Sequence, residues 1–187
     1  RCIVFRDGDE LVLGSRNERP LTRYFPEVVD NLRRALPQRC VVDGEVIVVT
    51  GDKLNFDGLQ QRIHPAASRV NMLAEKTPAS FVAFDLLALG DEDLTQAPFE
   101  ARRAALEHAL DEARPPVHVT PITRDEATAR DWFERFEGAG LDGLIAKRPD
   151  LTYQPEMRVM TKIMHVITAD CLLAGYRVQM AATDAIG

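Results

Sequence analysis

Five short segments of this chain place a charged side chain within, or directly after, a run of apolar residues typical of a β-strand. They are residues 14–17, 41–49, 81–87, 142–148 and 162–165. A charge that is buried in a strand is costly unless it is paired or binds something. The chain must therefore fold so that these charges meet partners or face a ligand, and these segments are the candidates for functional sites.

The pattern of local signals predicts a mixture of hairpins and helices. Asp7-Gly8 between short apolar runs predicts a β-hairpin, and Pro26 and Pro98 are each placed to open a helix. Apolar residues follow them with helical spacing; after Pro98 these faces carry Phe99, Arg102, Leu106 and Leu110. Residues 123–126 read as a capping box that starts a further helix at Thr123. Because strands and helices mix without strict alternation, we expect an α+β domain with antiparallel sheets and helices on their outer faces.

Composition limits the classes of protein to consider. The chain has 187 residues, enough for one sizeable domain or one domain and the start of another. Its net charge is −6, which counts mildly against a nucleic-acid partner but leaves room for a local basic face. Three scattered cysteines indicate buried thiols rather than a zinc site or disulfides. No apolar run is long enough to span a membrane, so we expect a reducing, cytoplasmic setting and no membrane partner.

Taken alone, each segment also has a purely structural interpretation. Asp43-Gly44-Glu45 could face a ribose or a metal, or could be a bulge in a surface strand. Phe84 could stack on a base, or simply fill a core strand that carries one polar residue. Asp142 could bind a metal and Lys147 a phosphate, or Lys147 could protect an edge strand. The segment with Arg16 reads as a turn, and that with Lys162 means little alone.

Taken together and in order, the five segments resemble the motifs of the ATP-dependent DNA ligases, within the covalent nucleotidyltransferases. The resemblance is closest to the bacterial type linked to double-strand-break repair, and it covers nearly the whole chain. The matches are Gly14-Ser15-Arg16, Asp43-Gly44-Glu45, Phe84-Asp85, the stretch from Asp142 to Lys147, and Lys162-Ile163-Met164.

The resemblance implies a nucleotidyltransferase fold, similar to the ATP-grasp type, over residues 1–167. Residues 168–187 resemble the beginning of the OB-fold domain that follows in this family. It also implies that a lysine attacks the α-phosphorus of ATP, that the AMP passes to the 5′-phosphate of a nick, and that the 3′-hydroxyl then displaces AMP. Nicked duplex DNA would be the partner, with repair proteins as further candidates, at the bacterial nucleoid.

The resemblance assigns roles residue by residue. Phe84 would stack on adenine, Glu45 would contact the ribose or a metal, and Arg1 and Arg16 would steady the ribose or the nick phosphate. Asp142 would help to hold Mg²⁺ or Mn²⁺. Lys147 and Lys162 would neutralise the α-phosphate as the catalytic lysines of this chain.

The sequence departs from the family pattern at three places. Arg1 matches the arginine that ends the opening motif, K-x-D-G-x-R, so we expect the nucleophilic lysine to lie upstream, outside this chain. Asp142 stands where glutamate is usual, and Met164 replaces the second lysine of K-x-K. Two alternatives therefore stay open: an RNA ligase or capping-type nucleotidyltransferase, and a degenerate module that binds nucleotide or DNA without catalysis.

Overall fold

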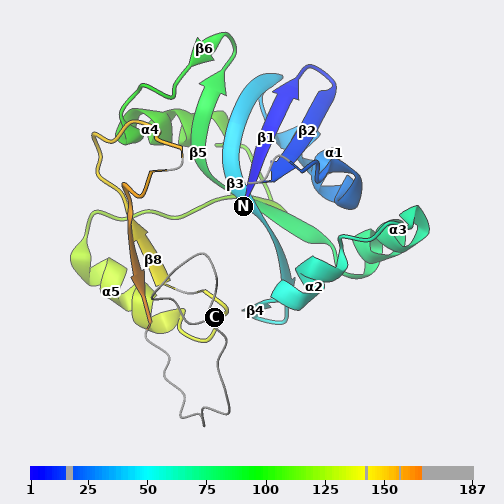
Figure 1. Ribbon diagram of the computed structural model, residues 1–187. Coiled ribbons are helices and arrows are strands. Elements are labelled where there is room, and N and C mark those ends of the chain that lie inside the picture. The colour runs from blue at the N-terminus through cyan, green and yellow to red at the C-terminus, as the bar shows by residue number, and fades with distance from the viewer. Residues whose placement is uncertain (16–18, 142, 156, 166–187) are drawn as a thin grey trace, which may run out of the picture.

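The computed structural model describes residues 1–15, 19–141, 143–155 and 157–165 (Figure 1). The strands are β1 (Cys2–Asp7), β2 (Glu10–Ser15), β3 (Arg39–Thr50), β4 (Lys53–Leu54), β5 (Ala79–Leu89), β6 (Glu92–Asp93), β7 (Val117–Val119), β8 (Gly143–Ala146) and β9 (Thr161–Met164). The helices are α1 (Pro26–Ala35), α2 (Phe56–Gln61), α3 (Ala67–Lys76), α4 (Phe99–Ala109) and α5 (Glu126–Arg135), preceded by a 3₁₀ turn, η1 (Thr22–Tyr24).

The main sheet is built around the two longest strands, β3 and β5. Its strand order is β2-β1-β3-β5-β6, with β4 added to β3 and β7 added to β5. All these pairs are antiparallel except β5 with β7, which the hairpin signals did not predict. The chain leaves β5, passes through α4 and returns beside β5 as β7, and such a return makes a parallel pair. The expected α+β class is confirmed.

A second, two-stranded sheet is formed by β8 and β9, with α5 in contact with β8. Figure 1 shows this unit at the lower left, apart from α2 and α3 at the right. The backbone of Leu54, in β4, donates to the carbonyl of Ala139 in the loop before β8. The small sheet is therefore joined to the main one by loops and side chains rather than by a shared ladder.

The hydrophobic core lies between the main sheet and the helices α1 and α4. The hairpin and the Pro26 helix form as predicted, since Gly8 takes the turn with a positive φ and α1 buries Val28, Val29 and Leu32. Helix α4 begins after Pro98 and packs on β5. The other large core side chains include Leu13, Phe25, Val42, Phe81, Leu86 and Leu106. This core fixes the strands whose opposite face carries the charged residues described below.

Of two further predictions, the start of helix α5 is wrong, and the OB-fold entry concerns residues that the structure does not describe. The helix α5 does not start with a capping box at Thr123. Its N-cap is Asp125, whose carboxylate accepts from the backbone of Thr128 at 2.7 Å, while the Thr123 hydroxyl accepts from Asp125. Asp125 stands directly before the first helical residue, so its carboxylate, rather than the threonine hydroxyl, accepts from the first turn. The predicted OB-fold entry, residues 168–187, lies outside the described residues.

The pairing of β3 with β5 is interrupted twice. Asp43 lies opposite Asp85 and Gly44 lies opposite Ala83, so Phe84 has no partner on β3. Leu87 also has no partner on β3, because Val41 pairs with Ala88 and Val42 pairs with Leu86. An extra residue on one strand is a β-bulge, which turns side chains away from strict alternation. Phe84 and Asp85 can therefore both be directed to one site although they are consecutive.

The first bulge depends on the glycine at position 44. A Cβ at Gly44 would lie 2.3 Å from Cζ of Phe81 and 2.6 Å from the carbonyl oxygen of Val82. We expect Gly44→Ala to lower the free energy of unfolding by about 2 kcal/mol, because the buried strand must shift to admit the methyl group. Urea denaturation measures this. Gly14→Ala is the control, since a Cβ there meets neighbours at 3.6 Å or more and should change little; equal effects would contradict this account.

Candidate nucleotide site

The charged residues of the main sheet gather where β1, β3 and β5 run side by side. Asp43 on β3 is 1% exposed and accepts two hydrogen bonds from Arg1, one of them from Nε at 3.1 Å. It also accepts a hydrogen bond at 3.1 Å from the hydroxyl of Tyr153, which follows β8 in the chain. Burial raises the pKa of Tyr153, and the charge of Asp43 adds to this, so the hydroxyl stays protonated and donates. Three segments far apart in sequence thus meet at Asp43.

A second carboxylate, Asp85 on β5, lies directly opposite Asp43 and is 3% exposed. Arg102 on α4 holds it in a two-point ion pair, with Nε at 2.8 Å and Nη2 at 3.0 Å. The amine of Lys147, just after β8, lies 3.8 Å from Asp85. Burial lowers the pKa of Lys147, partly countered by Asp85 and Asp43. The segment that follows the small sheet thus places the ammonium group of Lys147 beside a carboxylate of the main sheet.

Phe84 lies between the two charged groups. Its ring centre is 5.9 Å from the guanidinium of Arg1 and 5.3 Å from the amine of Lys147. The same amine lies 4.5 Å from the ring centre of Phe99 on α4. Cations over aromatic faces are attracted by the ring quadrupole. An aromatic ring flanked by two cations is suited to a ligand that combines a planar base with phosphate.

The structure brings together only some of the predicted site residues. Arg1, Phe84 and Lys147 come together as described. Glu45, on the same strand as Asp43, has a side chain that is 57% exposed. Lys162 lies on β9 with an exposed side chain, opposite Ile145 of β8. Arg16 and Asp142 lie outside the described residues.

Four residues of this cluster were not among the predicted site residues: Asp43, Asp85, Arg102 and Tyr153. Asp43 and Asp85 carried a signal, since each is a charge within an apolar run. Arg102 carried one too, because helical spacing puts it on the face of Leu106, which is buried. Nothing local in the sequence singles out Tyr153, which reaches Asp43 only through the folding of the segment after β8.

Residues 147–153 are fastened to α4 and the loop before it. The backbone of Glu100 donates to the carbonyl of Pro149 at 2.9 Å, and that of Tyr153 donates to Thr95 at 2.8 Å. Arg102 donates to the carbonyl of Leu151 at 3.0 Å. The segment that carries Lys147 and Tyr153 is therefore held at the site by backbone groups.

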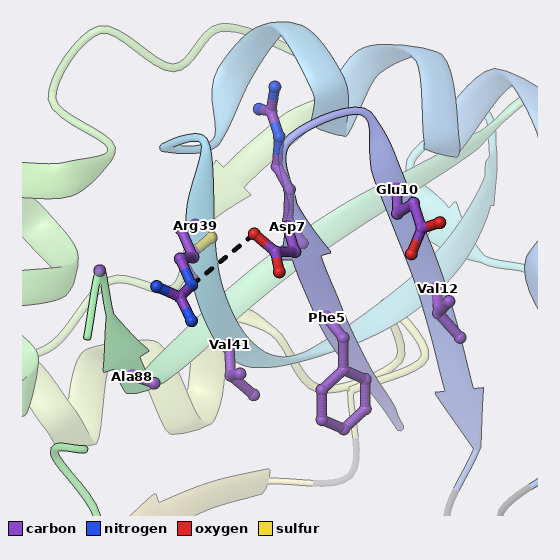
Figure 2. A pocket seen from close by; sticks show the side chains of 10 residues that line it. Phe5, Asp7, Glu10, Val12, Arg39, Val41 and Ala88 are labelled. Atoms are coloured by element: carbon purple, nitrogen blue, oxygen red, sulfur yellow. Dashed lines mark ion pairs between the residues drawn. The ribbon is translucent and has the colours of Figure 1, made fainter. Parts of the chain in front are cut away.

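A shallow hollow lies on the same face of the main sheet, beyond the charged cluster (Figure 2). Phe5 pairs with Val41, and Val41 with Ala88, two residues along β1 and β3 from Ile3 and Asp43. Arg39 and Asp7 form an ion pair of 3.6 Å at its rim. The hollow is lined by Phe5, Arg6, Asp7, Glu10, Val12, Arg39, Cys40, Val41, Ala88 and Gly90. It lacks the convergent cations of the cluster, so we take the cluster as the candidate site.

Three further observations concern metals, thiols and membranes. Among the described residues, no three His, Cys, Asp or Glu side chains come together as a metal cluster. Cys2 and Cys40 are buried free thiols as expected, and burial raises the pKa of Cys2 to about 12 and of Cys40 to about 11. No helix in the described ranges has the length and apolar character needed to cross a membrane.

Comparison with known proteins identifies the family. The sequence model described as "ATP dependent DNA ligase domain" matches residues 1–164. DNA ligase C of Mycobacterium tuberculosis is 63% identical over 191 aligned positions, covering 100% of this chain and 53% of the relative. DNA ligase C2 of Mycolicibacterium smegmatis is 61% identical over 187 positions, with the same coverage of both. The chain thus spans about half the length of these relatives.

Solved structures agree with the sequence comparison. The ligase domain of M. tuberculosis LigD matches with a TM-score of 0.67 and 29% identity, over 88% of this chain and 50% of that one. A mycobacterial DNA ligase D complexed with ATP and MES matches with a TM-score of 0.63 and 28% identity, with the same coverage. The expected nucleotidyltransferase fold is confirmed, and the DNA ligase interpretation is favoured over the RNA ligase and capping-enzyme alternative. The chain belongs to the family of ATP-dependent DNA ligase domains.

Proposed function

We propose that this chain is the part of a nick-sealing DNA ligase that binds ATP and presents its α-phosphate to a lysine lying upstream of Arg1 in the complete protein. The observation that carries the proposal is the meeting of Phe84, Arg1 and Lys147 at one place on the main sheet. The ring supplies a stacking surface for adenine. The two cations supply charge for phosphate, and Lys162 is proposed to add a third from β9.

The reaction fits this arrangement of residues. Transfer of a nucleotidyl group requires a nucleophile, positive charge near the phosphate and exact positioning, but little other covalent assistance. The lysine amine would bond to the α-phosphorus as pyrophosphate leaves. The 5′-phosphate of the nick would next take the AMP from the lysine, and the 3′-hydroxyl would then release it while joining the strand. In each step the cations balance charge that grows on the phosphate oxygens.

A divalent cation fits the carboxylates only in part. Asp43 and Asp85 are each engaged by an arginine, which leaves Glu45 as the open carboxylate beside the cluster. Mg²⁺ typically keeps several waters and uses one or two carboxylates together with substrate phosphates. We propose that Glu45 and Asp142 supply those carboxylates, and Mn²⁺ could take the same place. A bound metal would add positive charge at the phosphates.

The partner is proposed to be nicked duplex DNA, bound mainly through its phosphates and therefore sensitive to salt. Arg1 and Arg16 are proposed to steady the ribose or the nick phosphate. Residues 168–187 are proposed to begin the OB-fold domain. The protein is proposed to act at the bacterial nucleoid, with double-strand-break repair proteins as further partners.

Labelling with radioactive ATP tests the proposal. This chain and the complete protein are each incubated with α-labelled ATP and Mg²⁺, denatured, and examined for label on the protein. We expect label only on the complete protein. Label on this chain would place the nucleophile among its own lysines and show that Arg1 does not end the opening motif.

Absence of label from both proteins has a different meaning. It would favour the alternative of a module that binds nucleotide without catalysis, to which the changes at Asp142 and Met164 would contribute. A comparison of nicked DNA with nicked RNA as substrate of the complete protein then separates a DNA ligase from an RNA ligase.

A further inference from the structure

The site contains an electrostatic conflict that the fold has to resolve. Asp43 and Asp85 are both buried and lie directly opposite each other on β3 and β5. Like charges at opposite positions of a strand pair destabilise it, and burial away from water makes each charge costly. Each carboxylate therefore needs a cation of its own.

Two arginines meet this need separately. Arg1 pairs with Asp43, and Arg102 pairs with Asp85 through two hydrogen bonds in the fork geometry that suits a carboxylate. Arg102 is 2% exposed and cannot easily turn away. Its Nη1 also donates to the carbonyls of Ala97 and Leu151, at 2.6 Å and 3.0 Å.

Lys147 is the cation left over. Its amine is 3.8 Å from Asp85, beyond ordinary hydrogen-bonding distance, whereas Arg102 already holds both oxygens of that carboxylate. Among the described residues, Arg1, Arg102 and Lys147 thus lie at two buried carboxylates, and Lys147 is the cation that has no buried carboxylate to itself. Without Arg102, the buried carboxylate of Asp85 would have Lys147 as its nearest cation, and a small rotation of the lysine would turn their 3.8 Å ion pair into a direct hydrogen bond.

We propose that Arg102 is a positioning residue that occupies Asp85 and thereby keeps the amine of Lys147 available for a phosphate group. The phosphate part rests on the proposed function, since that assigns Lys147 to the nucleotide. The side chain of Arg102 donates to Asp85 and to two backbone carbonyls. It acts through Asp85, and it also holds the segment that carries Lys147 by its bond to Leu151.

The test is made on the complete protein with Arg102→Gln, and with Arg103→Gln as the matched control. Arg103 is the next residue of α4 and is equally buried, but it pairs with Glu107 and the carbonyl of Thr120, away from the cluster. Competitive acylation over a range of pH, followed by mass spectrometry, measures the pKa of the Lys147 amine. The rate of protein adenylation over a range of ATP concentrations measures function.

We expect Arg102→Gln to raise the pKa of Lys147, because the repelling guanidinium is gone and Asp85 is free to pair with the lysine. Adenylation should fall at least about tenfold, as expected for the loss of one charge-assisted contact with phosphate. Arg103→Gln should leave both unchanged. An unchanged pKa of Lys147 in Arg102→Gln would overturn the proposal.

A double variant separates this role from plain loss of stability. In Asp85→Asn with Arg102→Gln, the competing carboxylate is removed together with its arginine. We expect the pKa of Lys147 to fall below that in Arg102→Gln, and adenylation to recover at least in part. A double variant no more active than Arg102→Gln would overturn the proposal. If Arg102→Gln fails to fold, the comparison is made with Arg102→Lys instead. Lysine keeps the positive charge but cannot donate two parallel hydrogen bonds to Asp85.

The two readouts also distinguish this proposal from the proposed function. The pKa of Lys147 is measured without nucleotide. A protein that never forms an adenylate, yet shows the expected pKa changes, would refute the function and leave the role of Arg102 towards Asp85 and Lys147 standing.

Discussion

Lys162→Ala in the complete protein is expected to reduce formation of the protein adenylate by at least about 100-fold, the size of effect seen when one stabiliser of transition-state charge is removed. Lys162 lies opposite Ile145 in the β8–β9 ladder. Lys147 directly follows the last residue of β8, Ala146, and is the other lysine that the proposed function assigns to the phosphates. Lys147→Ala should therefore have an effect of similar size.

Lys76→Ala is the control for this prediction. Lys76 ends α3 with an exposed side chain and belongs to a different part of the fold. Label from α-labelled ATP is measured for each variant in the initial, linear phase. If Lys162→Ala and Lys76→Ala retained the same activity, the assignment of the phosphate lysines would be refuted.

Arg62→Ala is expected to lower the free energy of unfolding by roughly 3–5 kcal/mol, the range for breaking a buried ion pair. Arg62 follows α2 and is fully buried. It donates to both carboxylate oxygens of Glu27 on α1, at 2.6 Å and 2.9 Å, and to the carbonyls of Tyr24 and Thr77. Its removal leaves Glu27 without its main cation and takes the Arg62 donors away from two carbonyls, in a largely buried region.

Urea denaturation followed by circular dichroism measures the loss, and Arg69→Ala is the control. Arg69 lies on α3 with an exposed side chain, so its replacement should stay within about 0.5 kcal/mol of the parent. A midpoint shift for Arg62→Ala no larger than for Arg69→Ala would show that the buried pair contributes little to stability. The hydrogen-bond partners of Arg62 are Glu27, Tyr24 and Thr77, none of which belongs to the cluster, so any protein that still folds should keep its nucleotide site.

The elements that could be predicted from the sequence are those specified by neighbouring residues. Asp7-Gly8 specifies the hairpin, and Pro26 with its apolar spacing specifies α1. The charges within apolar runs pointed to the right strands. Family resemblance supplied the order of the motifs, and the fold agrees with it.

What the sequence did not reveal depends on contacts between distant segments. The parallel pairing of β7, the bulge at Phe84 and the approach of Tyr153 to Asp43 all follow from packing. Asp43 was overlooked beside Glu45 because a single sequence cannot tell which of two nearby carboxylates turns inward. The two carboxylates lie on the same face of β3, and Asp43 is the buried one because Arg1 and Tyr153, from distant parts of the chain, contact it.

The facing carboxylates of Asp43 and Asp85 set a limit on how robust this protein can become. Replacing a buried ion pair by apolar side chains of similar volume often stabilises a protein, since it removes the desolvation penalty. Selection for heat resistance alone would therefore favour losing Asp43 with Arg1, or Asp85 with Arg102. If the proposed function holds, variants obtained that way would be more stable but would bind nucleotide less well. Thermal tolerance is therefore better sought at the surface, where stabilising changes leave these four residues intact.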